Sequence, residues 1–134
     1  MKQIFGKSQS GNLQEAVRGI SRPQLLMLFS NNEQFEKHVK QLETLYPKVP
    51  SIGCIGMSYD SRIVEKGVGV IAFENGVSAA ANVLEEASSM PVKYIERLEQ
   101  DVEKIDGSQK DTVCIDFCSG NDACVLTTIH SVLK

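Results

Sequence analysis

Small polar residues stand at points where the chain passes from an apolar segment into a turn. Ser30 and Asn31 follow one apolar run, and Ser119 and Asn121 follow another. Residues of this kind cap helix N-termini, where free N–H groups and the helix dipole also favour an anion. A third position follows a glycine-rich stretch, where the backbone can approach a ligand closely. The candidate ligand-binding residues are therefore Ser30, Asn31, Gly56, Ser58, Tyr59, Ser119 and Asn121.

The ligand that suits this set is a carboxylate, such as that of an amino acid. In open α/β sheets, ligands bind at the carboxyl ends of strands, which is where these residues are expected. The alternative is that the serines and asparagines only cap helices, as such residues routinely do.

Cysteine chemistry is a second possibility. Cys54 lies in a glycine-flanked segment, and a catalytic thiolate needs a nearby histidine as its base. The chain has two histidines, His38 and His130. We expect His38 to be solvated, on the helix side away from Phe35 and Leu42. Cys54 is then a structural thiol, and the sequence predicts no enzyme.

Metal and cofactor patterns are weak. The cysteines are spaced differently from the close pairs of structural zinc sites, and no phosphate-binding glycine loop is present. We therefore predict no cofactor, and a lone histidine is a weak pointer to haem. Asp116 interrupts an apolar segment, so its carboxylate must face water, a partner or a polar pocket.

Composition sets the class of protein. The 134 residues are 42% hydrophobic, which is enough for the core of an ordinary domain. The 14 basic and 17 acidic residues give a net charge of -3, and the basic residues are scattered, which argues against a nucleic-acid partner. No apolar run is long enough to span a bilayer, and the N-terminus does not have the pattern of a secretory signal. We expect a cytoplasmic protein without a membrane partner.

Hydrophobic periodicity predicts the elements that position these residues. Residues 1–11 are polar and are expected to be a flexible lead-in, with a short strand at Ile4 and Phe5, before a brief helix capped by Asn12. The expected strands are residues 25–29, 51–56, 67–73, 77–84 and 112–118, and a tight hairpin turn at Glu74, Asn75 and Gly76 is expected to join the third strand to the fourth. The expected longer helices are residues 32–46, 92–105 and 123–133, of which the helix at 92–105 is expected to lie on a sheet. The fold class is α/β, a layered mixed sheet of about five strands with flanking helices. The expected division is 1–22 for the lead-in and short helix, and 23–134 for the α/β domain.

Two segments of the sequence also resemble each other. Residues 25–31 and residues 113–119 are both apolar segments that run into a polar cap and an expected helix. The first continues into another strand, whereas the second reaches Lys134 where that strand would begin. We infer a truncated part of a larger, repeat-containing domain, incomplete at its C-terminus.

Four short segments, in this order, resemble a known family. They are LLMLFSN, IGCIGMS, GVGVIAF and GVSAAA, and the resemblance extends over roughly residues 23 to 131. Together they are similar to the N-terminal half of FIST domains, and the IGCIGMS stretch is the most distinctive of them.

The resemblance implies a sensory domain of signal-transduction proteins. Such a domain binds a small ligand, such as an amino acid, beside an output module such as a chemoreceptor or histidine kinase. Three alternatives stay open: a cysteine-dependent enzyme, a haem-based gas sensor, and a structural assembly domain that forms a homo-oligomer through the apolar last helix.

Overall fold

The structure, a computed structural model, describes residues 1–56, 58–59, 62–63, 66–85, 91–106, 110–117 and 123–132. The chain divides into two compact units, Met1–Val77 and Ser78–Lys134, each of which is described by itself. Within the described ranges, no helix is long and apolar enough to cross a membrane.

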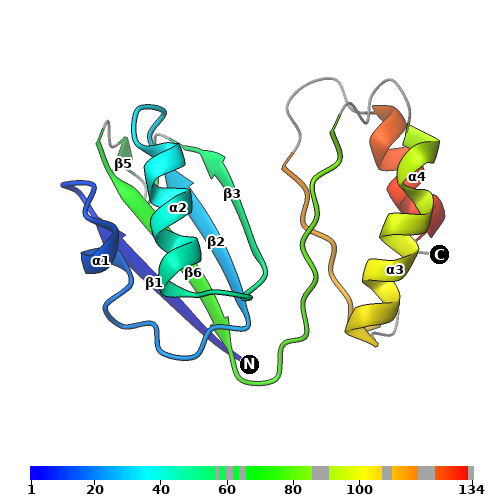
Figure 1. The fold of residues 1–134 in the computed structure, drawn as a ribbon, viewed down its shortest axis with the longest axis horizontal. Helices are drawn as coiled ribbons and strands as arrows, with labels where there is room; N and C mark the ends of the chain where they lie inside the picture. The colour runs from blue at the N-terminus through cyan, green and yellow to red at the C-terminus, as the bar shows by residue number, and fades with distance from the viewer. Residues whose placement is uncertain are drawn as a thin grey trace. The chain divides into compact units, whose positions relative to one another are not determined.

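The first unit is built on a four-stranded mixed sheet, which confirms the predicted α/β class (Figure 1). The strand order is β1-β6-β2-β3, in which β1 and β6 run antiparallel, β6 and β2 antiparallel, and β2 and β3 parallel. The strands are β1 (Lys2–Ser8), β2 (Leu25–Ser30), β3 (Ser51–Ile55) and β6 (Val68–Glu74). A separate two-stranded ribbon pairs β4 (Ser58–Tyr59) with β5 (Arg62–Ile63).

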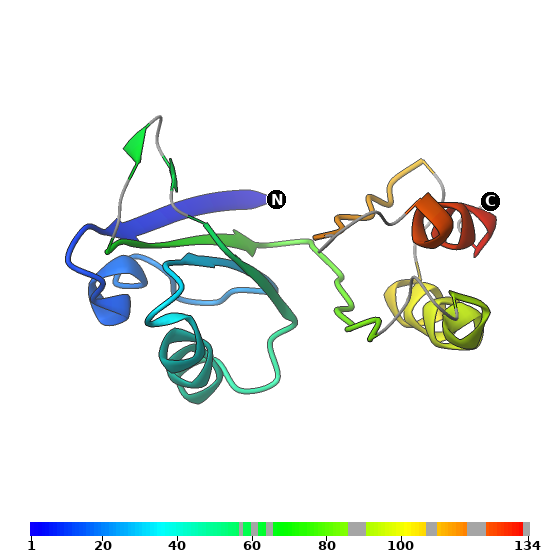
Figure 2. The same ribbon diagram turned by 90° about the horizontal axis from the view of Figure 1, so that it is seen from above.

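Two helices, α1 (Leu13–Ala16) and α2 (Phe35–Leu45), cover one face of this sheet (Figure 2). The core lies between them and the sheet, where alternate residues of β2 and β6 point inward. Its fully buried members include Leu13, Leu26, Leu28, Val68 and Val70. Gly6 of β1 permits this packing, because a Cβ atom there would lie 1.7 Å from the Ala16 carbonyl oxygen.

The other face of the sheet is apolar as well, and no described helix of the first unit lies on it. Strand alternation and register assign this second face to the residues that point away from the core. The large apolar residues among them, together with Cys54, are Phe5, Leu25, Met27, Phe29, Ile52, Ile71 and Phe73, and the remaining ones are Gln3, Lys7 and Gly69. Most are only half-buried, and Phe5 is 43% exposed.

Two expectations about this sheet were wrong. Residues 1–11 are not a flexible lead-in, since β1 pairs with β6 along its whole length. Residues 77–84 do not form a strand hairpinned with β6. The reason is that β6 already has a neighbour on each side, β1 and β2, so no edge is left for a hairpin partner. The predicted turn at Asn75 and Gly76 does form, and both residues have positive φ.

The second unit contains a 3₁₀ turn (Pro91–Tyr94) and two helices, α3 (Ile95–Ile105) and α4 (Ala123–Val132). The helices lie side by side (Figures 1 and 2), and a small core of Tyr94 and Ile129 is packed by Leu84 and Leu98. The Arg97 guanidinium lies 5.3 Å from the centre of the Tyr94 ring. We expected α3 to lie on a sheet, but within its unit it packs beside α4.

Another strand was expected at residues 112–118, and its described residues, 112–117, do not form one. The second of the two similar segments, residues 113–119, is therefore followed by its expected helix, α4, but its described residues do not form the expected strand. Asp116 is exposed, so water is within reach of its carboxylate, which is one of the three surroundings expected for it. Cys118 lies outside the described residues.

Candidate functional site

The carboxyl end of β2 carries a buried polar network. Ser30, the last residue of β2, and His38, in the first turns of α2, both have 0% of their surface exposed. The Ser30 Oγ atom lies 2.6 Å from His38 Nδ1, and His38 Nε2 lies 2.9 Å from the carbonyl oxygen of Gly11. Three segments of the first unit, the β1–α1 turn, β2 and α2, are thus joined through one imidazole.

The partners of the ring fix its tautomer when it is neutral. A carbonyl oxygen only accepts, so Nε2 carries the proton and donates it to Gly11. Nδ1 is then the acceptor, and the Ser30 hydroxyl donates to it. A fully buried hydroxyl held in this way is a structural group and not an accessible nucleophile. Of the predicted ligand-binding residues, Ser30 therefore positions the site but does not line it.

The expectation that His38 is solvated was wrong. His38 follows Phe35 by three residues and precedes Leu42 by four, which are the spacings of a single helix face. That face packs against the sheet, because Leu42 is 4% exposed and Phe35 packs against the core. The spacing was visible in the sequence. The polar character of histidine obscured it.

Asn31 is the second predicted residue at this end, and it is 5% exposed. Its Oδ1 atom accepts a hydrogen bond from the Gln34 backbone N–H at 2.9 Å, so it holds the turn that leads into α2. This turn explains why α2 begins at Phe35 and not at residue 32. Within the described parts of the chain, nothing accepts a hydrogen bond from the Asn31 side-chain NH₂ group.

Gln34 was not singled out from the sequence. Its Oε1 atom is buried, and among the described residues it has no hydrogen-bond partner. It lies beside Gly11, where a Cβ atom would come within 2.7 Å of Oε1 and within 2.9 Å of the Lys66 carbonyl oxygen. A buried acceptor without a protein donor is the kind of group that a ligand or a water molecule satisfies. No sequence pattern marks such an atom, because it depends on how the β1–α1 turn packs against α2.

The end of β3 supplies the remaining described candidates. The Gly56 N–H donates to the Ser30 carbonyl oxygen at 2.9 Å, which continues the β2–β3 ladder and brings Gly56 beside Ser30. Gly53 is the closely packed glycine of this strand, since a Cβ atom there would lie 3.0 Å from the Leu28 carbonyl oxygen. Ser58 and Tyr59 form β4, and only their backbone is described. Ser119 and Asn121 lie outside the described residues.

Cys54 and His38 do not form a pair. In the parallel β2–β3 ladder, Ser30 is opposite Ile55 and Phe29 is opposite Cys54. Ser30 faces α2, so Cys54 points to the second face of the sheet, away from His38. Burial raises the pKa of the Cys54 thiol, which lowers its thiolate fraction at neutral pH. Across the described residues, no group of three or more metal-ligating side chains occurs.

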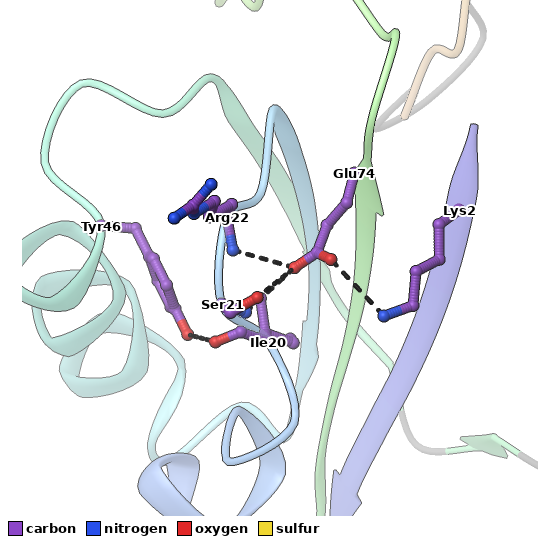
Figure 3. Close-up of polar contacts among 6 residues, drawn as sticks. All are labelled: Lys2, Ile20, Ser21, Arg22, Tyr46 and Glu74. Carbon is purple, nitrogen blue, oxygen red and sulfur yellow. Dashed lines mark hydrogen bonds and ion pairs between the residues drawn. The ribbon is translucent and has the colours of Figure 1, made fainter.

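The opposite end of the sheet holds a buried carboxylate, Glu74, which is 3% exposed (Figure 3). Its Oε1 atom accepts hydrogen bonds from the backbone N–H groups of Ser21 and Arg22, each at 2.9 Å. Its Oε2 atom lies 3.7 Å from the Lys2 ammonium. These backbone bonds, from Arg22 first and then Ser21, lower the pKa of Glu74 against the opposing effect of burial. The carboxylate anchors the loop between α1 and β2, and sequence reasoning had assigned it only to a turn.

Tyr46 braces the same loop from the end of α2. Its hydroxyl donates to the Ile20 carbonyl oxygen at 3.0 Å, with the Val17 carbonyl oxygen at 3.5 Å (Figure 3). Burial, and then the charge of Glu74, raise the pKa of Tyr46. This end is therefore a structural clasp, with its polar groups directed at the protein's own backbone.

Fold and site together define a mixed α/β unit with a polar network at the carboxyl ends of its parallel strands. No family model, no curated protein and no solved structure matches this chain.

Proposed function

We propose that the chain is a cytoplasmic sensory domain that binds a small ligand, an amino acid or small carboxylate, and signals to an effector module such as a chemoreceptor or histidine kinase. The resemblance of its sequence to the N-terminal half of FIST domains motivates the proposal. It involves no catalytic step by this chain.

The observation that carries the proposal is that one turn holds a hydrogen-bond donor and a hydrogen-bond acceptor that have no partner among the described residues. The Asn31 NH₂ group has no acceptor among the described residues, and the buried Gln34 Oε1 atom has no donor. A carboxylate accepts from an amide NH₂, and an ammonium donates to an amide oxygen. An amino acid carries both complementary groups.

Two of the alternatives have less support at this site. A cysteine-dependent enzyme needs an imidazole beside Cys54, but the register directs the two side chains to opposite faces of the sheet. Haem ligation by His38 would require one of its two hydrogen bonds, to Ser30 or to Gly11, to break inside the core.

The test is a thermal-shift screen of the full chain against amino acids, small carboxylates and haem. A ligand that prefers the folded state must raise the melting temperature. For any ligand found, Asn31→Ala should weaken binding about tenfold, because a hydrogen bond to a charged group contributes about 1.5 kcal/mol or more. Asn32→Ala is the matched control, since the neighbouring Asn32 is exposed.

Gln34→Leu should distinguish recognition of the ligand's ammonium group from recognition of its carboxylate. It removes the acceptor for an ammonium group, so it should weaken binding of an amino acid more than binding of the corresponding carboxylate without the amine. The proposal fails if no compound in the screen stabilises the chain. It also fails if Asn31→Ala and Asn32→Ala change the affinity equally.

A further inference from the structure

The edge strand β3 presents unpaired backbone groups. Parallel strands bond through alternate residues, and here the Pro50 carbonyl and the Gly56 N–H face β2. The same alternation directs the backbone N–H and C=O groups of Ile52 and Cys54 toward β2. It directs those of Ser51, Gly53 and Ile55 toward the outer edge. All three of these residues are exposed, and no described residue bonds to their N–H or C=O groups.

The two edges of the sheet differ in their protection against pairing. Native proteins guard an edge with charged side chains, lysine above all. The β1 edge carries Lys2 and Lys7. The β3 edge has the sequence SIGCI, without a charge, and Ile55 is 53% exposed. An unguarded edge of this kind is a template for another strand.

Residues 112–117, which have the sequence TVCIDF, are an extended segment with the composition of such a strand (Figures 1 and 2). Val113, Ile115 and Phe117 alternate with the other residues, and they are 80%, 43% and 38% exposed. Residues 112–115 form no hydrogen bond with the described residues. Residues 77–84 are also extended, but the backbone of Val83 already forms hydrogen bonds, with the side chains of Asn82 and Arg97.

We propose that residues 112–117 of one molecule add as a strand to the β3 edge of a second copy of this chain. Residues 112–115 of the segment supply backbone donors and acceptors for the outward groups of Ser51, Gly53 and Ile55, and those groups in turn bond to residues 112–115. When its alternating apolar side chains lie on the second face of the sheet, they continue the row of Met27 and Ile52. Each copy holds one edge and one segment, so two copies satisfy both pairings in a closed, twofold-symmetric dimer.

The first experiment measures the oligomeric state of the full chain by sedimentation equilibrium. We expect a dimer. Val113→Lys and Ile55→Lys, one on each side of the proposed pairing, should each raise the dimer dissociation constant by about tenfold or more through loss of cross-strand contacts and a charge at the edge. Val92→Lys is the matched control, because Val92 is also an exposed valine of the second unit, 73% exposed, and lies outside the segment.

Hydrogen exchange locates the interface in the unaltered chain. The outward amides of Ser51, Gly53 and Ile55 and alternate amides of residues 112–117 should gain protection as the protein concentration rises. A monomer overturns the proposal, as does protection that is independent of concentration, which would mean pairing within one molecule. A dimer that protects β3 but leaves residues 112–117 unprotected also overturns it.

Discussion

The sheet buries an imidazole at the carboxyl end of β2 and a carboxylate at the carboxyl end of β6. His38 is held by a hydroxyl and a carbonyl oxygen, whereas Glu74 is held by backbone N–H groups and an ammonium. Both groups are almost fully withdrawn from water. They therefore illustrate two ways to bury a polar side chain, by hydrogen bonds to uncharged groups or by compensation of its charge.

The difference also separates the two ends by their role. At the Glu74 end, the polar atoms of Glu74, Tyr46 and the α1–β2 loop bind one another (Figure 3). At the His38 end, the network is satisfied in its interior, but at its margin one side-chain group each of Asn31 and Gln34 has no hydrogen-bond partner among the described residues. An end that is closed on itself stabilises the fold, and an end with unused polar atoms can accept a ligand.

Removal of the imidazole should have the largest effect on stability. His38→Leu keeps much of the side-chain volume but removes the ring partner of both the Ser30 hydroxyl and the Gly11 carbonyl. The buried hydroxyl then keeps only the Asn31 carbonyl oxygen, 3.4 Å away. Each orphaned group costs about 1–3 kcal/mol, so we expect a loss of about 3 kcal/mol in the free energy of unfolding, measured by urea denaturation.

The double variant Ser30→Ala/His38→Leu tests the cause of that loss. It removes the orphaned hydroxyl together with its partner, so it should be more stable than His38→Leu alone. A double variant that is less stable than the single one would contradict the proposed donation from Ser30 to the ring.

Loss of the carboxylate should have a smaller effect, with a distinct pH dependence. Glu74→Gln keeps one oxygen acceptor but loses the charge that the backbone N–H groups stabilise. The lowered pKa means that this stabilisation is complete above the ordinary pKa of glutamate and is lost as the pH falls through the lowered value. Urea denaturation should therefore show the variant less stable at neutral pH and the difference shrinking in acid.

Lys2→Ala is the control for this comparison. The Lys2 side chain is 61% exposed and its ammonium lies 3.7 Å from Oε2, so its removal should matter less than removal of the carboxylate charge. A larger loss for Lys2→Ala than for Glu74→Gln would mean that the ion pair, and not the backbone bonds, holds the loop.

Much of the first unit was predictable because its local patterns agree with its tertiary partners. The apolar run of β2 reads as an inner strand and is one, and Asn12 reads as a cap and accepts from Gln14 and Glu15. Residues 77–84 have an equally good strand pattern and form none. A pattern predicts what a segment is able to form, but the order of strands decides which edges are free.

The site was less predictable for a related reason. Ser30 and Asn31 are found from their position after an apolar run, but their exposure depends on what packs above them. His38 was mistaken for a surface residue although its spacing matches the core face of α2, and Glu74 was read as part of a turn. Both bind partners distant in sequence, which are 27 residues away for Gly11 and 52 for Arg22. No single-sequence pattern encodes such pairs.

The smallest effect should come from the hydroxyl that braces the closed end. Tyr46→Phe removes one hydrogen bond to Ile20, which contributes about 1 kcal/mol. The raised pKa of Tyr46 means that its bond stabilises the fold below the ordinary tyrosine pKa and is lost as the pH rises through the raised value. Urea denaturation should show the variant less stable at pH 8, with the gap closing in alkali.

Tyr94→Phe is the matched control, since the Tyr94 hydroxyl donates to the Glu85 carbonyl oxygen within the second unit. If the two units unfold separately, each phenylalanine variant should lower the stability of its own unit alone, as followed by hydrogen exchange at β2 and at α3. Equal losses in both units from Tyr46→Phe would contradict separate unfolding and would mean that the chain unfolds as one cooperative body.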